Sequence, residues 1–248
     1  MAEQSRVALV TGGSRGIGAA TVFQLAEAGW DVLLTYREDR SSAQGIVDRC
    51  AAVGRTAVPA QCDMADPASI EATYGVLDER FGRLDALVCN AGIAAPAKTV
   101  EQIDAARVSQ MMTINVVAPF LLCARAVPRL RAAGGGSIVL VSSVAARLGS
   151  PGEYVDYAAS KAAVDALTVG LAKEVAADSI RVNSVRPGPI LTDIHATNGA
   201  PGRAERIGAA MPAGRAGEPE EVAVTITWLC DAAPDYLTAS IIEIAGGR

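Results

Sequence analysis

The sequence has little of several things that common protein classes require. It contains one histidine, His195, which excludes a metal site with several histidine ligands and leaves one candidate base for a serine–histidine hydrolase. No run approaches eighteen apolar residues, so the sequence predicts no membrane span. There is no basic cluster and the net charge is −5, which argues against nucleic acid as a partner.

Paired cysteines and a targeting signal are also missing. The five cysteines form an odd number without a Cys-x-x-Cys pair, which is typical of reduced thiols and predicts a cytoplasmic protein. The first residues, MAEQSRVALVTGG, hold too short an apolar stretch for a signal peptide. What is present is a chain of 248 residues, half of them apolar, which is long enough for a substantial core.

Short apolar segments alternate with longer alanine-rich segments at helical spacing. This alternation predicts β–α–β crossovers and a parallel sheet covered on both faces, in a single α/β domain over residues 1–248. The predicted strands are Val7–Val10, Val32–Tyr36, Thr56–Gln61, Ala86–Cys89, Ser137–Val141, Arg181–Val185 and Ser240–Ile244. The predicted helices are Ile17–Ala28, Ser41–Val53, Pro67–Phe81, Thr99–Met111, Asn115–Arg131, Val155–Ala177 and Glu220–Cys230.

A segment rich in proline and glycine interrupts this pattern near the C-terminal end. Five of the twelve prolines lie from Pro187 to Pro219, with six glycines between them. Loops of this length inside compact domains are usually functional lids. The sequence therefore predicts a mobile substrate loop at about 187–218 rather than a domain boundary.

The first predicted strand leads into a glycine-rich turn and then into a helix. The turn runs Thr11-Gly12-Gly13-Ser14-Arg15-Gly16-Ile17-Gly18. Its glycines let the backbone turn tightly and approach a pyrophosphate, while the helix N-terminus supplies free N–H groups. We therefore expect a dinucleotide cofactor here, and a helix-start turn without a ligand is the alternative.

The residues after the second strand bear on which cofactor binds. Proteins that bind NAD commonly place an acidic residue there to hold the ribose hydroxyls. Here the strand ends at Tyr36 and Arg37 follows, while Arg15 lies in the glycine-rich turn. Because arginine pairs with phosphate through two hydrogen bonds, these residues favour NADP(H) over NAD(H). Glu38 and Asp39 are the alternative, since either carboxylate can reach a ribose.

Two further strand ends carry residues that suit a cofactor. Asp63, followed by Met64, is placed to accept a hydrogen bond from an adenine amino group, although an aspartate that begins a turn shows the same pattern. Asn90-Ala91-Gly92 follows the fourth strand, where small residues let the backbone pass close to a cofactor. A plain turn is the alternative at this position as well.

The sharpest chemical signal is a tyrosine four residues before a lysine, Tyr157 and Lys161. On a helix the two side chains share one face, and a nearby ammonium group lowers the pKa of tyrosine from about 10. A phenol tuned in this way can protonate an alkoxide or deprotonate an alcohol. Tyr154 has no lysine at the same spacing. A surface tyrosine–lysine pair is the alternative interpretation.

Other polar residues can complete such a site. Ser142 and Ser143 end the strand before this helix, where open α/β sheets bind ligands, and a hydroxyl there can bind the substrate oxygen. Asn115 opens a predicted helix and is either its cap or the residue that holds a water relaying protons to Lys161. His195 is either a pocket residue or a plain loop residue, and no Gly-x-Ser-x-Gly elbow accompanies it.

Together these motifs resemble the short-chain dehydrogenase/reductase family over nearly the whole chain. The resemblance includes the glycine-rich turn, Asn90-Ala91-Gly92, the Tyr157–Lys161 pair, Arg186-Pro187-Gly188 and the closing Ala245-Gly246-Gly247. It implies a Rossmann-type, doubly wound sheet of about seven parallel strands in a homotetramer or homodimer. It also implies hydride transfer between nicotinamide and a carbonyl or alcohol carbon, with no metal.

The resemblance assigns roles to single residues. Asn115, Ser143, Tyr157 and Lys161 match the catalytic tetrad, in which the tyrosine is the general acid or base and the serine binds the substrate oxygen. The lysine of this tetrad also binds the nicotinamide ribose. The segment that holds the nicotinamide carboxamide is matched by Pro187, Gly188, Ile190 and Thr192.

The sequence therefore predicts an NADP(H)-dependent carbonyl reductase or alcohol dehydrogenase that acts on a small molecule. Two other functions stay open. One is reduction of a 3-oxoacyl thioester on an acyl carrier protein, which Arg125, Arg129 and Arg131 favour and which Asp178 and the net charge of −5 oppose. The other is a non-catalytic NADP-binding regulator, which would have no need of an intact tetrad.

Overall fold

The computed structural model describes residues 5–192 and 202–248 of the chain. Within them lies one seven-stranded parallel sheet with the strand order β3-β2-β1-β4-β5-β6-β7. Its strands are β1 (Val7–Val10), β2 (Asp31–Tyr36), β3 (Ala57–Gln61), β4 (Ala86–Cys89), β5 (Gly136–Val141), β6 (Ile180–Pro187) and β7 (Ile241–Ile244). The doubly wound α/β fold predicted from the sequence is confirmed.

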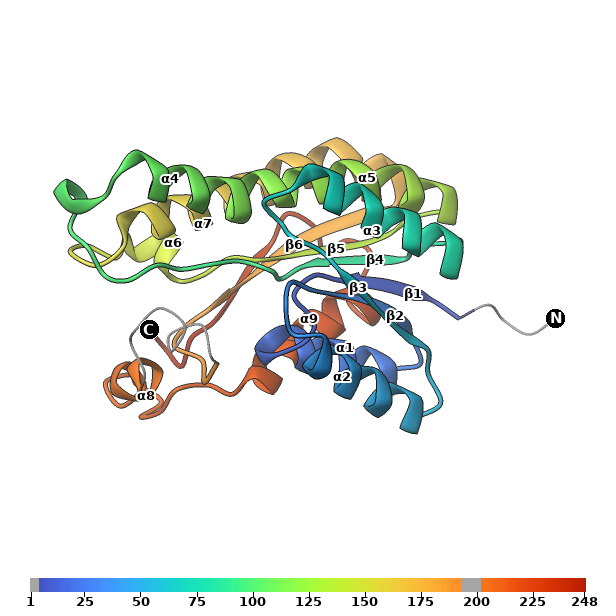
Figure 1. Cartoon of the computed structure of the whole chain (residues 1–248), viewed down its shortest axis with the longest axis horizontal. Helices are drawn as coiled ribbons and strands as arrows, with labels where there is room; N and C mark the ends of the chain where they lie inside the picture. Colours follow the sequence, from blue (N-terminus) through green and yellow to red (C-terminus); the bar gives the residue numbers. More distant parts are fainter. Residues whose placement is uncertain (1–4, 193–201) are drawn as a thin grey trace.

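Helices cover both faces of the sheet (Figure 1). One face is covered by α1 (Gly16–Glu27), α2 (Arg40–Ala52) and α9 (Pro219–Asp231). The opposite face is covered by α3 (Pro67–Arg80), α4 (Ala105–Met112), α5 (Ala118–Ala133) and α7 (Val155–Val175). Two short helices, α6 (Ala145–Leu148) and α8 (Arg203–Gly208), lie beyond the carboxyl ends of the strands.

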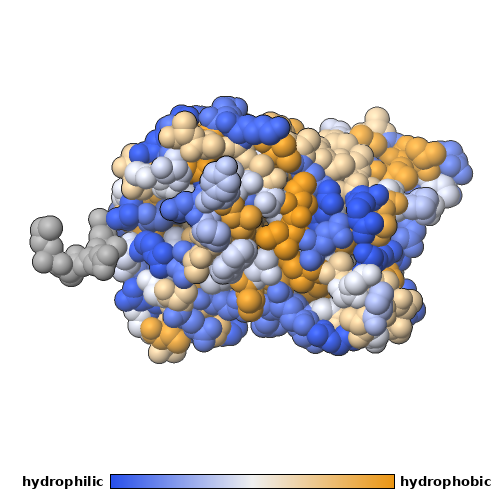
Figure 2. Space-filling model, turned by 180° about the vertical axis from the view of Figure 1, so that it is seen from behind, coloured by the Kyte–Doolittle hydropathy of each residue, from blue (hydrophilic) through white to orange (hydrophobic). Residues whose placement is uncertain are grey.

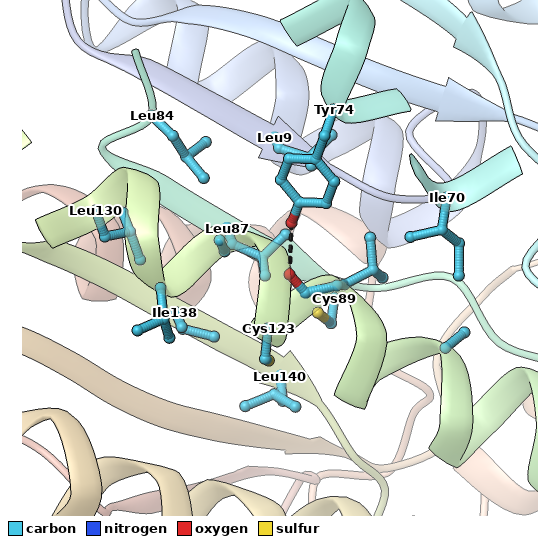
Figure 3. Packing of buried hydrophobic residues seen from close by; sticks show 14 of the residues in the cluster. Leu9, Ile70, Tyr74, Leu84, Leu87, Cys89, Cys123, Leu130, Ile138 and Leu140 are labelled. Atoms are coloured by element: carbon cyan, nitrogen blue, oxygen red, sulfur yellow. Dashed lines mark hydrogen bonds between the residues drawn. The ribbon is translucent and has the colours of Figure 1, made fainter. Parts of the chain in front are cut away.

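Each face of the sheet has its own apolar core, because successive residues of a strand point to opposite faces. Leu87 of β4 belongs to the core beneath α3, α5 and α7, and its neighbour Val88 belongs to the core beneath α1, α2 and α9. Figure 3 shows part of the first core, where the buried Tyr74 donates a hydrogen bond of 2.6 Å to the carbonyl oxygen of Leu122. Strands covered on both sides explain the continuous apolar runs in the sequence.

The order of the strands reverses between β1 and β4. The chain adds β2 and β3 on one side of β1, and then returns to add β4 and the later strands on the other side. In open sheets of this kind, ligands bind outside the carboxyl ends of the strands at such a switch point. The glycine-rich turn follows β1 and Asn90-Ala91-Gly92 follows β4, so both motifs lie at this point.

The helices after β4 differ from the prediction. The segment Thr99–Met111 is not one helix, since a 3₁₀ turn over Val100–Gln102 precedes α4. No helix begins at Asn115 either, because a π-helical turn, η2 (Thr113–Val117), joins α4 and α5 with helical backbone throughout. A π turn is a rare single turn with i→i+5 hydrogen bonds, and it has no short sequence motif from which we could predict it.

The second helix begins one residue earlier than predicted. Its first residue is Arg40, because Asp39 is the helix cap. The Asp39 carboxylate accepts a hydrogen bond from the backbone amide of Ser42 over 2.9 Å. The cap commits this carboxylate to the protein, which bears on the cofactor below.

The predicted substrate loop contains more regular structure than expected. Strand β6 extends through Pro187. Ile190 forms an isolated parallel bridge with Gly217, and α8 lies between these two residues in the sequence. Residues 193–201, including His195, lie outside the described residues. The mobility of the segment stays a prediction.

The helical run from Ala105 to Ala133 is long and apolar enough to cross a bilayer by length and composition alone. An 18-residue window within it has a mean hydropathy of 1.5, and half of that window is buried inside the protein. This helical run contains no unbroken apolar stretch of eighteen residues, and a mean hydropathy can be high even where polar residues are scattered through the window. The core helix of a sheet-and-helix fold has the same composition, since one of its faces is buried.

Apolar side chains also remain on the surface of two helical regions. Val117 and Phe120 are exposed around the start of α5, and Val224 and Trp228 are exposed on α9. Figure 2 shows hydrophobic patches between hydrophilic ones on the side opposite the view of Figure 1. The homotetramer or homodimer implied by the family resemblance stays a prediction.

The packing around Gly18 makes a testable prediction. A Cβ atom at Gly18 would lie 2.1 Å from the carbonyl oxygen of Gly12, so we expect Gly18→Ala to lower the free energy of unfolding by about 1–3 kcal/mol. Gly75→Ala is the matched control, because this glycine of α3 is exposed and has open space around it. It should raise the free energy of unfolding by about 0.5–1 kcal/mol through better helix propensity. Urea denaturation measures both, and wild-type stability for Gly18→Ala would contradict the close approach.

Candidate active site

Hydrogen bonds fasten the glycine-rich turn to the strands beside it. The backbone amide of Gly12 donates to Oγ1 of Thr35, at the end of β2, over 3.0 Å. From the end of β4, Nδ2 of Asn90 donates to the carbonyl oxygens of Thr11 and Gly12 over 2.9 and 3.1 Å. These bonds hold the turn in shape before any ligand binds. Thr35 was not among the predicted site residues, because a threonine near the end of a strand does not by itself indicate a binding site.

One cavity of about 730 Å³ runs along the carboxyl ends of the strands. Of the residues predicted to bind cofactor or substrate, it brings together Gly12, Ser14, Arg15, Gly16, Ile17, Arg37, Asp63, Met64, Asn90, Ala91, Gly92, Ser143, Tyr157, Lys161, Pro187, Gly188, Ile190 and Thr192. Two predicted residues do not line it. Gly18 packs beneath the glycine-rich turn, and Asn115 is buried behind the cavity.

The glycine-rich end of the cavity fits a dinucleotide. Arg15, the cap residue of α1, makes no side-chain capping bond, so the first N–H groups of that helix have no side-chain partner there. A Cβ atom at Gly16 would lie 3.1 Å from the side chain of Thr192, so bare backbone forms this part of the wall. Uncapped N–H groups at the positive end of a helix suit the phosphates of a cofactor.

The two carboxylates that compete for the ribose are already engaged. The Asp39 carboxylate accepts hydrogen bonds from the amide and the hydroxyl of Ser42 over 2.9 and 2.5 Å. These bonds lower the pKa of Asp39, and the charge of Arg15 adds a smaller effect. Glu38 pairs with Arg37 over 2.8 Å at the surface. A ribose would have to compete with these partners for either carboxylate.

Asp63 combines the two roles considered for it. It lines the cavity, and its carboxylate also accepts a hydrogen bond from the amide of Ala65 over 2.9 Å, as in a turn. The turn holds one carboxylate oxygen, and the second oxygen is still available to a ligand. The turn thus fixes the position of the carboxylate next to the cavity.

Tyr157, Lys161 and Ser143 meet in the middle of the cavity, at the start of α7. Nζ of Lys161 lies 5.8 Å from the centre of the Tyr157 ring and donates to the carbonyl oxygen of Val141 over 2.8 Å. The Ser143 side chain lies close enough to Tyr157 to lower the pKa of the phenol. Ser142 instead donates to the carbonyl oxygen of Lys161 over 3.1 Å and is buried. Of the two serines, Ser143 is therefore the one next to the phenol.

Burial shifts the pKa values of the tyrosine and the lysine in opposite directions. It raises the pKa of Tyr157 to about 12, against a smaller lowering effect of the Ser143 hydrogen bond. It lowers the pKa of Lys161 to about 8, and the charge of Asp165 opposes that shift. The lowered tyrosine pKa expected from the sequence is therefore wrong for the protein without a cofactor, because burial disfavours the phenolate.

Asn115 lies behind the cavity in the π turn. Its Oδ1 accepts a hydrogen bond from the amide of Ile93 over 2.8 Å, and its Nδ2 donates to the carbonyl oxygen of Ile93 and to Oγ of Ser160. A Cβ atom at Gly92 would lie 3.1 Å from Oδ1 of Asn115 and 3.4 Å from Nζ of Lys161. Only the bare backbone of Gly92 therefore separates Asn115 from the lysine.

The far end of the cavity holds charged residues that the sequence analysis missed. Arg203 of α8 pairs with Glu153 over 2.5 Å, and its guanidinium group lies 5.2 Å from the centre of the Tyr154 ring. The Tyr154 ring in turn stands edge-on to Tyr157, with 5.9 Å between the ring centres. No sequence signal connects Arg203 to this group, because the chain brings it back from the segment after β6.

A doubly wound parallel sheet with a glycine-rich turn and a tyrosine–lysine pair at the same edge defines an oxidoreductase that uses a nicotinamide cofactor. A family model described as Enoyl-(Acyl carrier protein) reductase matches residues 12–248. The chain is 48% identical over 245 residues to the uncharacterized oxidoreductase YgfF of Escherichia coli (strain K12), covering 98% of this chain and 99% of the relative.

Two solved structures extend the comparison. A short-chain dehydrogenase/reductase from Serratia marcescens is 33% identical, with a TM-score of 0.91 and 98% of each chain covered. A blue fluorescent protein from a metagenomic library, solved in complex with NADPH, is 34% identical, with a TM-score of 0.88 and 98% of this chain and 97% of that chain covered. The chain belongs to the short-chain dehydrogenase/reductase family.

The pKa of Lys161, lowered to about 8, predicts how activity depends on pH. As pH rises through this value Lys161 loses its charge, whereas Tyr157, with a pKa of about 12, keeps its proton. In the reductive direction we expect kcat/KM for the cofactor, which reports the free enzyme, to fall with rising pH around pH 8. Lys161→Arg, which stays charged, should move the fall to higher pH. A fall near pH 8 in both proteins would assign the titration to another group.

Proposed function

We propose that the protein transfers a hydride between NADP(H) and a small carbonyl or alcohol substrate, with Tyr157 as general acid or base. The observation that carries this proposal is the meeting of Tyr157, Ser143 and Lys161 in one cavity, of which the glycine-rich turn forms one end. Membership of the family supports the oxidoreductase class. The far end of the cavity, around Arg203, is the space for the substrate.

Each residue has its own step in the reductive direction. The Tyr157 hydroxyl donates its proton to the carbonyl oxygen as negative charge develops there. Ser143 donates a hydrogen bond to the same oxygen, so the two hydroxyl groups polarise the carbonyl and the proposed mechanism needs no metal. Lys161 binds the nicotinamide ribose, and its charge stabilises the phenolate that remains. The bound cofactor supplies the hydride.

The shifted pKa values suit this direction. A tyrosine whose pKa is raised keeps its proton at neutral pH, which is the state that a general acid requires. In the reverse direction Tyr157 must be a phenolate, and the charge of Lys161, together with a cationic nicotinamide ring, favours that form. In this proposal Asn115, which lies across Gly92 from Lys161, holds the water that returns a proton to the lysine.

Tyr157→Phe tests the catalytic role. This change keeps the ring and removes the hydroxyl, so we expect kcat to fall by at least about 10² to 10⁴-fold while the Kd for NADPH changes little. Tyr154→Phe is the matched control: it lies in the same cavity, but its ring faces the guanidinium group of Arg203 and no lysine follows it four residues on, so turnover should stay within about tenfold of wild type. A panel of ketones, aldehydes and sugars with NADPH measures both.

Near-normal turnover in Tyr157→Phe would contradict the role of Tyr157 as general acid or base. If wild type binds NADPH and turns over no substrate of the panel, a non-catalytic NADP-binding regulator becomes the better description. The binding measurement and the turnover measurement together separate these two outcomes.

The preference for NADP(H) over NAD(H) rests on the adenosine end of the cavity. Arg15 and Arg37 both line it, and the two nearby carboxylates are engaged by Ser42 and by Arg37. Guanidinium groups bind a 2′-phosphate well, whereas an NAD ribose needs a free carboxylate. Similarity to a protein solved in complex with NADPH supports the same cofactor.

Arg37→Ala tests this preference. We expect wild type to bind NADPH at least about tenfold more tightly than NADH, and Arg37→Ala to lose most of that difference, about 1.4 kcal/mol per decade. Glu38→Gln is the control, since it frees Arg37 from its partner and should leave NADPH binding equal or tighter. Fluorescence titration gives the Kd values. Equal affinity of wild type for both cofactors would assign the ribose to Glu38 or Asp39.

Reduction of a 3-oxoacyl thioester on an acyl carrier protein is the second candidate, because the matching family model is described by an acyl-carrier-protein substrate. The arginines that would dock an acidic carrier are, however, already paired within the chain. The pairs are Arg125–Glu71 at 2.5 Å, Arg129–Asp78 at 2.5 Å and Arg131–Asp178 at 2.7 Å. Comparing short 3-oxoacyl thioesters with simple ketones and sugars discriminates between the two candidates.

A further inference from the structure

A chain of alternating charges runs from the candidate active site to the surface. It begins with Asp165 on α7, continues through Arg186 at the end of β6 and Glu243 on β7, and ends with Arg147 on α6. Its inner end lies one helical turn beyond Lys161. We infer that Asp165 is a positioning residue that keeps Lys161 charged. Only the effect of this charge on catalysis rests on the proposed function.

The geometry of α7 brings the two groups together. Residues four apart share a helix face, and side chains tilt toward the helix N-terminus, so the Asp165 carboxylate lies over the turn that carries Lys161. Both residues are buried, with 7% and 5% of their surface exposed. Charges interact strongly in such surroundings, because little water screens them.

The Asp165 carboxylate does not pair directly with the lysine. Its Oδ2 accepts hydrogen bonds from Nε and Nη2 of Arg186 over 3.1 and 2.8 Å. Its Oδ1 is buried and has no hydrogen-bond partner among the described residues. The ion pair with Arg186 thus leaves one oxygen of the Asp165 carboxylate unpaired, in surroundings that screen electrostatic interactions with Lys161 only weakly.

Asp165 has the largest effect that favours the charged form of Lys161, and Cys89 has a smaller one in the same direction. The Val141 carbonyl of β5 accepts the hydrogen bond from Nζ, and the neutral amide of Asn115 lies across Gly92. From β4 comes the Cys89 thiol, whose pKa is raised by a hydrogen bond with Cys123 and by burial, so the thiol is neutral near pH 8. Tyr157, on the same helix as Lys161, is protonated there as well.

Asp165 also has a purely structural interpretation, as the anchor of Arg186. The outer part of the chain of alternating charges offers a way to separate the structural role of Asp165 from its effect on Lys161. Glu243 binds the same arginine over 3.2 Å, but it lies beyond Arg186 from the lysine and is nearer the surface. Loss of either carboxylate weakens the hold on Arg186, and only loss of Asp165 removes charge next to Lys161.

The composition of the chain allows a direct measurement of the Lys161 charge. The sequence has three lysines, Lys98, Lys161 and Lys173, so protein labelled with ¹³C at the lysine ε-carbon shows three signals. Lys98→Arg and Lys173→Arg identify the signal of Lys161. Its titration can be followed by NMR in the full chain without cofactor or substrate, so the result does not depend on the proposed function.

In wild type we expect the Lys161 signal to titrate near its pKa of about 8. Asp165→Asn should lower that midpoint by about one pH unit, because a nearby opposite charge is removed. Glu243→Gln, the matched control, should leave the midpoint in place, and Asp165→Glu should restore it. The alkaline fall of reductive kcat/KM should move with the NMR midpoint in each variant.

A midpoint in Asp165→Asn equal to that of wild type overturns the inference, whatever happens to stability. Asp165→Ser gives a second test should Asp165→Asn fail to fold. It also removes the carboxylate, so the Lys161 midpoint should fall, and an unchanged midpoint would overturn the inference. If the midpoints move as expected and Tyr157→Phe is fully active, the charge-holding role stands and the proposed catalytic role fails.

Discussion

Hydrogen bonds between the ends of β1 and β4 are the constraint on which the rest of the site depends. The strand order reverses there, and Asn90 fastens the glycine-rich turn by donating to the carbonyl oxygens of Thr11 and Gly12. The Thr11 hydroxyl in turn accepts from the amides of Asn90 and Ala91. The reversal opens the cavity, and these bonds keep its wall in a shape that bare backbone can present to phosphates.

Burial of charge is the second theme of the site. The buried position that lets the ammonium of Lys161 act strongly on a neighbour also destabilises that ammonium, and it disfavours the phenolate of Tyr157 in the same way. Oriented polar groups interact with the two buried side chains. The carbonyl oxygen of Val141 lies at the lysine, the hydroxyl of Ser143 at the phenol, and the carboxylate of Asp165 one helical turn away. Preorganised groups of this kind need no rearrangement when charge develops during a reaction.

Much of the fold could be predicted from local patterns, and the errors share a cause. Short apolar runs marked most strands, because strands covered on both faces are rich in apolar residues, although β6 also carries the buried Asn183 and Ser184. The π turn around Asn115 was missed, since such turns are rare and carry no short sequence motif. The start of α2 was predicted one residue too late, because the backbone conformation that makes Asp39 the cap is not visible in the apolar spacing.

The sequence by itself determined the parallel sheet, the glycine-rich turn and the tyrosine–lysine pair, because each depends on residues close together in the chain. Only the tertiary structure decided which serine meets Tyr157, that Arg203 returns to Glu153, and that Asp165 begins a chain of charges through Arg186. It also reversed the expected direction of the tyrosine pKa. Burial and long-range contacts arise when distant segments pack together, and no local spacing encodes how much water that packing removes.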